Sequence, residues 1–169
     1  MKSVLIASAL ALAALSVNAM AAADAGHQHG AGDSAHAMHG SHAEHAPAIG
    51  KPGDAKKVTR TMTVDMNDTM KFSPATLSVK KGETIRFVVK NSGKIKHEMV
   101  LGSTAELKAH AAMMKQMPEM EHADANMVTV EPGKTGEIIW QFSKAGKFDF
   151  ACLQPGHFEA GMKGQVVVK

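Results

Sequence analysis

The sequence has one cysteine, no tyrosine and few aromatic residues, which make up 4% of its 169 positions. A single cysteine excludes an internal disulfide, so in an oxidising compartment this thiol is buried, paired with another chain, or bound to a metal. Neither sign of charge dominates, because the formal net charge is +3 and the lysines are scattered. That pattern argues against a nucleic-acid partner. No Ser/His/Asp arrangement and no phosphate-binding glycine loop is present either.

The longest apolar run lies at the N-terminus. Lys2 precedes an apolar stretch from Val4 to Val17, and small residues follow at positions 19, 21 and 23. The stretch is too short for a comfortable membrane span and has the order of a signal peptide. We therefore expect residues 1–21 to be a cleaved signal peptide, with the mature protein in the periplasm and no longer in the membrane.

Residues 22–57 are rich in alanine, glycine and histidine and poor in large aliphatic side chains. Such a segment buries too little apolar surface to offset the entropy of ordering, so we expect it to be disordered. A flexible chain can still gather imidazoles around a metal ion, which makes this segment a candidate for accessory copper binding; the alternative is a neutral linker. Its histidines are His27, His29, His36, His39, His42 and His45.

From residue 58 to residue 169 the sequence changes to short runs of alternating apolar residues. Residues 84–91 and 138–142 are examples, and glycine, proline and asparagine separate the runs. Strands of this length with turn residues between them predict an all-β domain, an antiparallel β-sandwich. One stretch differs: Ser103 and Glu106 form a capping box and Pro118 should end the helix that follows. We expect a helical insertion at about residues 104–117.

The insertion and the residues after it contain many methionines. Thioethers with a nearby imidazole would select Cu(I), so these residues are candidate accessory copper ligands. The alternative is that the methionines pack against the sandwich, because methionine fills irregular gaps well. The candidates are Met113, Met114, Met117, Met120 and His122.

The segment from Cys152 to Met162 brings together three kinds of metal ligand. A thiolate, the imidazole of His157 and a thioether follow one another with four residues in each gap. Copper that changes between its oxidation states favours this mixture, since imidazole suits both states while thiolate and thioether favour Cu(I). Cys152 lies an even number of residues from Phe148 and Phe150 and so on the same face of the strand. Its thiol is therefore expected to point inward.

A further ligand is expected from another strand. His97 follows a turn at residues 91–93 and shares parity with Ile95, Met99 and Leu101, so we expect it to point inward as well. The sequence therefore predicts one mononuclear type 1-like copper site whose ligands are His97, Cys152, His157 and Met162.

Two stretches resemble the plastocyanin/azurin family of cupredoxins. They are MKFSPATLSVKKGETIRFVVKNSGKIKHEMVLG, from residue 70, and ACLQPGHFEAGMKGQVVV, from residue 151. The resemblance covers about a hundred residues. It implies a Greek-key β-sandwich in a cupredoxin domain at 58–169, copper as the cofactor, and the same four ligands. The His-rich leader and Met-rich insertion are more similar still to periplasmic copper-tolerance cupredoxins of the CopI type, which implies copper handling.

Three functions are compatible with residues of these types. The first is a copper-binding protein that protects against excess copper, with copper ions and a copper-handling protein as partners. The second is an electron carrier between periplasmic redox proteins, with an apolar docking surface near His157 and Phe158. The third, a copper oxidase or nitrite reductase-like enzyme, needs further copper centres, for which the domain offers only His110 and His122. We therefore expect no enzymatic activity.

Overall fold

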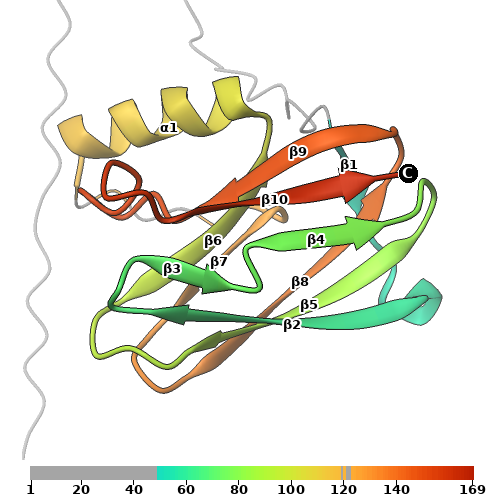
Figure 1. The fold of residues 1–169 in the computed structure, drawn as a ribbon, viewed down its shortest axis with the longest axis horizontal. Coiled ribbons are helices and arrows are strands. Elements are labelled where there is room, and N and C mark those ends of the chain that lie inside the picture. Colours follow the sequence, from blue (N-terminus) through green and yellow to red (C-terminus); the bar gives the residue numbers. More distant parts are fainter. Residues whose placement is uncertain (1–48, 119, 121–122) are drawn as a thin grey trace, which may run out of the picture. The chain divides into compact units, whose positions relative to one another are not determined.

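Two β-sheets and one α-helix make up the part of the chain that the structure, a computed structural model, describes: residues 49–118, 120 and 123–169. One sheet has the strand order β1-β8-β5-β2-β3 and the other β4-β10-β9-β6-β7 (Figure 1). The elements are β1 (Gly50–Pro52), η1 (Ala55–Lys57), β2 (Arg60–Asn67), β3 (Lys71–Ser73), β4 (Thr76–Val79), β5 (Thr84–Asn91), β6 (His97–Gly102), α1 (Thr104–Gln116), β7 (Met127–Val130), β8 (Thr135–Phe142), β9 (Gly146–Ala151) and β10 (Lys163–Val168). The predicted Greek-key β-sandwich with a helical insertion is confirmed.

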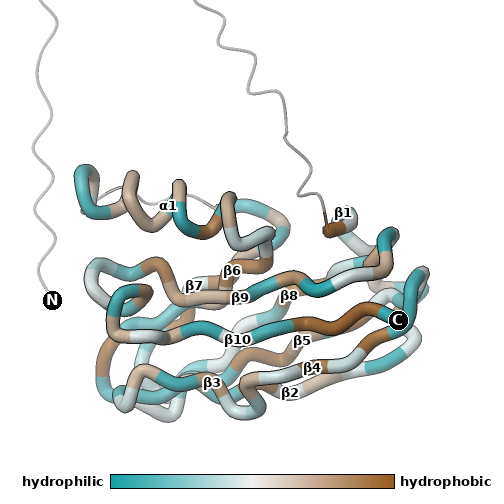
Figure 2. The backbone as a smooth tube through the Cα atoms, turned by 45° about the horizontal axis from the view of Figure 1, so that its top comes forward, coloured by the Kyte–Doolittle hydropathy of each residue, from teal (hydrophilic) through white to brown (hydrophobic). Residues whose placement is uncertain are grey.

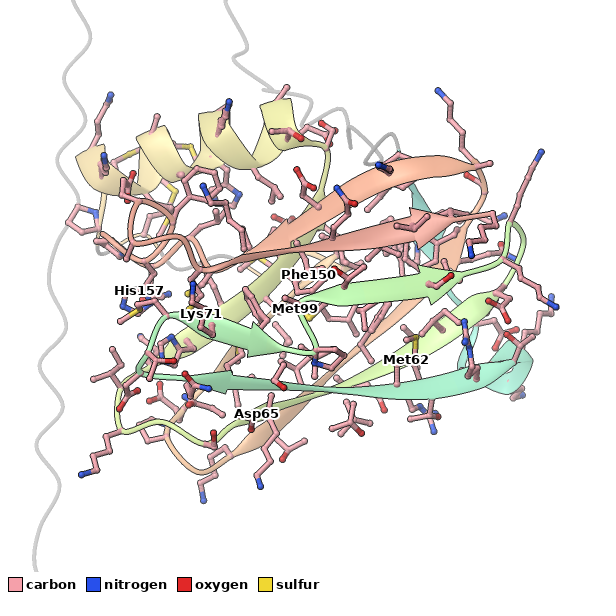
Figure 3. All side chains as sticks on the ribbon, in the orientation of Figure 1. Met62, Asp65, Lys71, Met99, Phe150 and His157 are labelled. Carbon is pink, nitrogen blue, oxygen red and sulfur yellow. The ribbon has the colours of Figure 1, made fainter. Side chains whose placement is uncertain are left out.

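The core lies between the two sheets and follows the alternation in the sequence. On β5, Ile85, Phe87 and Val89 are fully buried, and Trp140 of β8 packs into the same core cluster. Figure 2 shows hydrophobic segments along β5, β6 and β10. Figure 3 shows Met99 and Phe150 lying between the sheets. A period of two places every second side chain on the same face, which is why these strands bury one face each.

The helix α1 covers the outer face of the second sheet (Figure 1). The Ser103 hydroxyl accepts a hydrogen bond from the Glu106 backbone N–H, and the Glu106 side chain accepts one from the Ser103 N–H, so the predicted capping box is formed. Leu107, Ala111 and Met114 pack against this sheet in a second apolar cluster. As a consequence β6 is buried on both faces, with all six residues inaccessible to solvent.

The strands are not all antiparallel, so that part of the prediction is wrong. β2 pairs with β5 in parallel, and β10 pairs with β4 in parallel, while the other pairs are antiparallel. Alternation in a sequence fixes which face of a strand is buried but carries no information on the direction of its neighbour. The chain crosses between the sheets, and these crossings bring strands side by side in the same direction.

The fold includes residues that the sequence predicts to be disordered. The prediction of disorder as far as residue 57 is wrong for residues 49–57, because Ile49 is fully buried, β1 pairs with β8, and η1 follows. The remainder of the predicted leader and the signal peptide lie outside the described residues. Among the described residues, no helix is both long enough and apolar enough to cross a membrane.

Candidate metal centre

His97, Cys152 and His157 converge at one end of the sandwich. Each offers one ligand atom, and the three atoms lie within 4.8 Å of one another. The Cys152 Sγ lies 3.2 Å from His157 Nδ1 and 4.0 Å from His97 Nδ1, and the two Nδ1 atoms are 3.2 Å apart. His97 begins β6, Cys152 directly follows β9, and His157 lies in the loop between β9 and β10. Figure 3 shows His157 at the end of the domain opposite the C-terminus seen in Figure 1.

These separations fit ligands that share one ion. Bonds of about 2.0 Å to imidazole nitrogen and about 2.3 Å to thiolate sulfur are typical of a divalent first-row metal. In a trigonal plane such bonds place the ligand atoms roughly 3.5 to 3.7 Å apart. The observed separations of 3.2, 3.2 and 4.0 Å bracket these values. Two imidazoles and one thiolate are also the donor set of a trigonal electron-transfer copper site. The residues therefore fit copper.

Asp68 fixes the orientation of the fully buried His97 ring. Its Oδ1 lies 3.2 Å from His97 Nε2, and its carboxylate also accepts hydrogen bonds from the backbone N–H groups of Lys94 and Ile95. These hydrogen bonds, that from Lys94 first, hold the pKa of the Asp68 carboxyl below its usual range. A carboxylate at Nε2 favours a proton on that nitrogen and leaves Nδ1 as the metal-facing lone pair.

The Cys152 sulfur lies in a dry, enclosed environment. Burial raises the pKa of the Cys152 thiol to about 12, against the opposing effect of backbone hydrogen bonds from Glu98 and Gln154. The Glu98 N–H is 3.4 Å from the sulfur. Without a metal the group is therefore a thiol at neutral pH, and a coordinating cation is needed to hold it as a thiolate. Burial also lowers the pKa of the partly exposed His157, which favours its neutral, metal-binding form.

Glu98 holds the first residues of the loop that follows Cys152. Its carboxylate is buried and accepts hydrogen bonds from the Leu153 backbone N–H at 2.9 Å and from Gln154 Nε2 at 3.1 Å. Thr129 Oγ1 lies 3.4 Å from the same carboxylate. Glu98 and Asp68 are not among the residues predicted from the sequence. The signal for Glu98 was a charged residue directly before the apolar run of residues 99–101, and no local signal marked Asp68.

The loop from Cys152 to Met162 is closed by its own backbone. The Cys152 N–H donates to the Met162 carbonyl at 3.1 Å, and the Met162 N–H donates to the His157 carbonyl at 3.0 Å. Gly156 and Gly161 have φ values of +85° and +91°. Residues with a side chain rarely adopt such angles, so glycine permits these turns. Met162 is fully buried in the same core cluster as Cys152. Its backbone thus lies beside both neighbouring ligands, and its role as the axial ligand stays a prediction.

One expectation about the surroundings of the centre is wrong. Ile95 lies an even number of residues from His97 but is 43% exposed, because residues 93–95 form a bend before β6 begins. Phe158, in the expected apolar docking surface, is half-buried and its ring packs against the cluster beneath α1, and the docking surface stays a prediction. The Lys163 ammonium lies 4.4 Å from the centre of that ring.

The structure places the predicted accessory ligands in different environments. Met113, Met117 and Met120 are exposed, whereas Met114 is buried beneath α1. His122 and the six leader histidines lie outside the described residues.

Comparisons with known proteins agree with this geometry. Residues 58–169 match the copper binding proteins of the plastocyanin/azurin family. The chain is 56% identical over 170 positions, covering 100% of both chains, to a protein named copper-resistant cuproprotein CopI from Rubrivivax gelatinosus. A protein of the same name from Pseudomonas aeruginosa is 38% identical over 154 residues, covering 74% of this chain and 84% of the relative.

A likeness to solved structures supports the fold. The crystal structure of dithionite-reduced auracyanin from Roseiflexus castenholzii matches with a TM-score of 0.57 and 21% identity. The match covers 66% of this chain and 98% of that one. The chain therefore belongs to the plastocyanin/azurin family of copper-binding proteins, with His97, Cys152 and His157 placed to hold the copper ion.

Proposed function

We propose that the chain is a periplasmic protein that holds one copper ion in a type 1-like centre and contributes to copper tolerance by binding excess copper. The observation that carries the proposal is the convergence of His97, Cys152 and His157 from three separate segments. The role in tolerance is supported by relatives named copper-resistant cuproprotein, one of them 56% identical over the whole chain. The apolar run after Lys2 supports export.

Bound copper would supply a centre that changes between two oxidation states. The chain's own residues make that centre selective, because the imidazoles accept copper in both states while the thiolate favours Cu(I). His97 and Cys152 are fully buried, so water is kept from that side of the ion. We assign Met162 as the weak axial ligand, on the grounds of its complete burial and its backbone hydrogen bonds to the two neighbouring ligands.

A copper titration followed by visible and spin-resonance spectroscopy tests the centre. Native protein should develop a strong visible charge-transfer band with the first equivalent of Cu(II), because a thiolate ligand gives that absorption. Cys152→Ala should lose the band and keep its fold by circular dichroism. His110→Ala, which removes an imidazole from α1 outside the centre, is the matched control and should keep the band. A band that persists in Cys152→Ala would mean that other ligands hold the metal.

The leader histidines are proposed as accessory copper ligands that add capacity. Replacing all six by glutamine keeps the chain length and removes the imidazoles. Native protein should bind more than one copper equivalent, and the replaced protein fewer, while both keep the visible band. A stoichiometry of one in both proteins would remove the case for storage.

Electron transfer with a periplasmic redox protein is the second candidate function. It is favoured by the exposure of His157, which is partly accessible while His97 is buried, so one ligand ring extends toward the surface. Fast, reversible electron exchange between the copper-loaded protein and a c-type cytochrome would support it. Loss of copper tolerance in a strain that carries only the six-glutamine variant, with electron exchange unchanged, would favour binding over transfer. Neither function requires catalytic turnover, and we infer that the chain is not an enzyme.

A further inference from the structure

A second group of soft ligands surrounds an open cavity of about 560 Å³ outside the metal centre. Residues of α1, β6 and β7 line the cavity. Figure 1 shows where these three elements lie in the fold. Three of the residues that line it are methionines from different segments: Met114 from α1, Met120 from the residues after the helix, and Met127 from the start of β7. Met114 is buried, Met127 is half-buried and Met120 is 38% exposed. The three methionines that line the cavity thus differ in how far they are exposed to solvent.

Packing alone does not account for this arrangement. Met114 belongs to the apolar cluster beneath α1, with Met127 against it, so packing explains part of their burial. It does not explain Met120, an exposed methionine that lines the same cavity. Methionine is well suited to filling gaps, yet here a space the size of a small-molecule pocket is left between the methionines. Flexible thioether side chains around such a space are free to close on a soft ion.

The charge on the cavity wall favours a cation. The described residues that line it include two carboxylates, those of Glu98 and Glu131, and one ammonium, that of Lys96. Neutral thioethers select Cu(I) over harder divalent ions, and a small excess of negative charge suits a monovalent ion. We propose that this cavity is a second Cu(I)-binding site, in which the thioethers of Met114, Met120 and Met127 bind the ion. The choice of copper rests on the proposed function.

The cavity and the primary centre share a wall. Glu98 and Gln154 line the cavity, and the same two residues donate backbone hydrogen bonds to the Cys152 sulfur. Their side chains are hydrogen-bonded to each other, with Gln154 Nε2 donating to Glu98 Oε2 at 3.1 Å. Because Gln154 belongs to the loop that begins at Cys152, this loop borders the cavity, which places the second site next to the first rather than at a remote surface.

The test compares two double substitutions in the full mature chain. Met120→Leu/Met127→Leu removes two cavity thioethers and leaves Met114 in its packed position. Met113→Leu/Met117→Leu is the matched control, because these methionines are 36% and 41% exposed in the same region and do not line the cavity. Each protein is titrated anaerobically with Cu(I) against a coloured chelator. In parallel, Ag(I), a redox-inert soft ion, is added to protein labelled with ¹³C in its methionine methyl groups, after the primary centre has been filled.

The cavity variant should bind one tightly held equivalent of Cu(I) fewer than native protein, while the control binds as many as native. Ag(I) should shift the methyl signals of Met114, Met120 and Met127 together in native protein. The cavity site would be overturned if both variants lost the same amount of bound Cu(I), if only the control lost bound Cu(I), or if neither variant did. The visible band of the primary centre is recorded for every protein. Its absence in native protein would refute the proposed function separately, whatever the cavity binds.

Discussion

Removing the Glu98 carboxylate should destabilise the metal-free protein by about 2 kcal/mol, as follows from the hydrogen bonds it accepts. In Glu98→Ala the buried Leu153 N–H loses its acceptor at 2.9 Å, and an orphaned buried donor costs about 1–3 kcal/mol. The Gln154 amide and the Thr129 hydroxyl are only part-buried and border the open cavity, so water can replace their lost partner. Most of the expected loss therefore comes from Leu153.

Glu98→Gln separates hydrogen bonding from charge. Its amide oxygen can still accept from the Leu153 N–H, and its amide N–H groups can donate to the Thr129 hydroxyl, so the stability loss should be less than about 1 kcal/mol. Both variants lose a negative charge beside the centre, and both should bind copper more weakly than native protein. Only Glu98→Ala should also broaden or shift the visible band, because it alone frees the backbone after Cys152.

The assay is denaturant unfolding of metal-free protein, supported by thermal unfolding. A loss of about 2 kcal/mol corresponds to a fall of roughly 8 °C in the midpoint for a domain of this size. Glu131→Ala is the matched control, because Glu131 lines the same cavity but is exposed, and it should change stability by less than about 0.5 kcal/mol. A Glu98→Ala protein as stable as native, or an equal effect of Glu131→Ala, would refute the assigned role of the carboxylate.

Four further outcomes are expected. Asp68→Asn should weaken copper binding about 10-fold in chelator competition, because the His97 tautomer is no longer fixed; unchanged affinity would contradict this. Met162→Leu should keep the visible band but alter the spin-resonance parameters and the reduction potential, and unaltered spectra would exclude Met162 as a ligand. Cu(I) binding at pH 7 should release one proton from Cys152, whose pKa in the metal-free fold is about 12. Because burial raises this pKa from 9.0, native metal-free protein should lose stability relative to Cys152→Ala as pH rises from about 9 to 12.

Elements with a strong local pattern were predictable from the sequence. Ile85, Phe87 and Val89 lie at every second position of residues 84–91, which form β5 with the same bounds, and the Ser103–Glu106 capping box marks the start of α1. β1, β3 and β7 were not predicted, because each has only three or four residues and no clear alternation. Such short strands are held by pairing with longer neighbours: β1 with β8, β3 with β2, and β7 with β6. This pairing depends on the tertiary structure and cannot be predicted from a local sequence pattern.

The candidate metal ligands were predictable from the sequence for a chemical reason. The carboxylates that orient them, Asp68 and Glu98, were not. Cysteine and histidine are rare enough that their order in a strand-rich sequence indicates a ligand set. Asp68 and Glu98 are common residue types at ordinary positions, and their contacts span 29 residues to His97 and 55 residues to Leu153. Only the folded chain brings these carboxylates to the ring and the loop that they orient. The three residues that the structure places to hold copper were therefore predictable from the sequence, and the two carboxylates that position them were not.

The fold supports the ligands of the centre through backbone and carboxylate groups. Cys152 is held on one side by the Met162 carbonyl and on the other by the Glu98 N–H, while Asp68 orients His97. Contacts of this kind fix the direction of the side chains that hold a metal. A centre supported in this way suits retention and electron transfer equally. The features that separate the two roles therefore lie outside it, in the six leader imidazoles and the methionines around the cavity, which an electron carrier would not require.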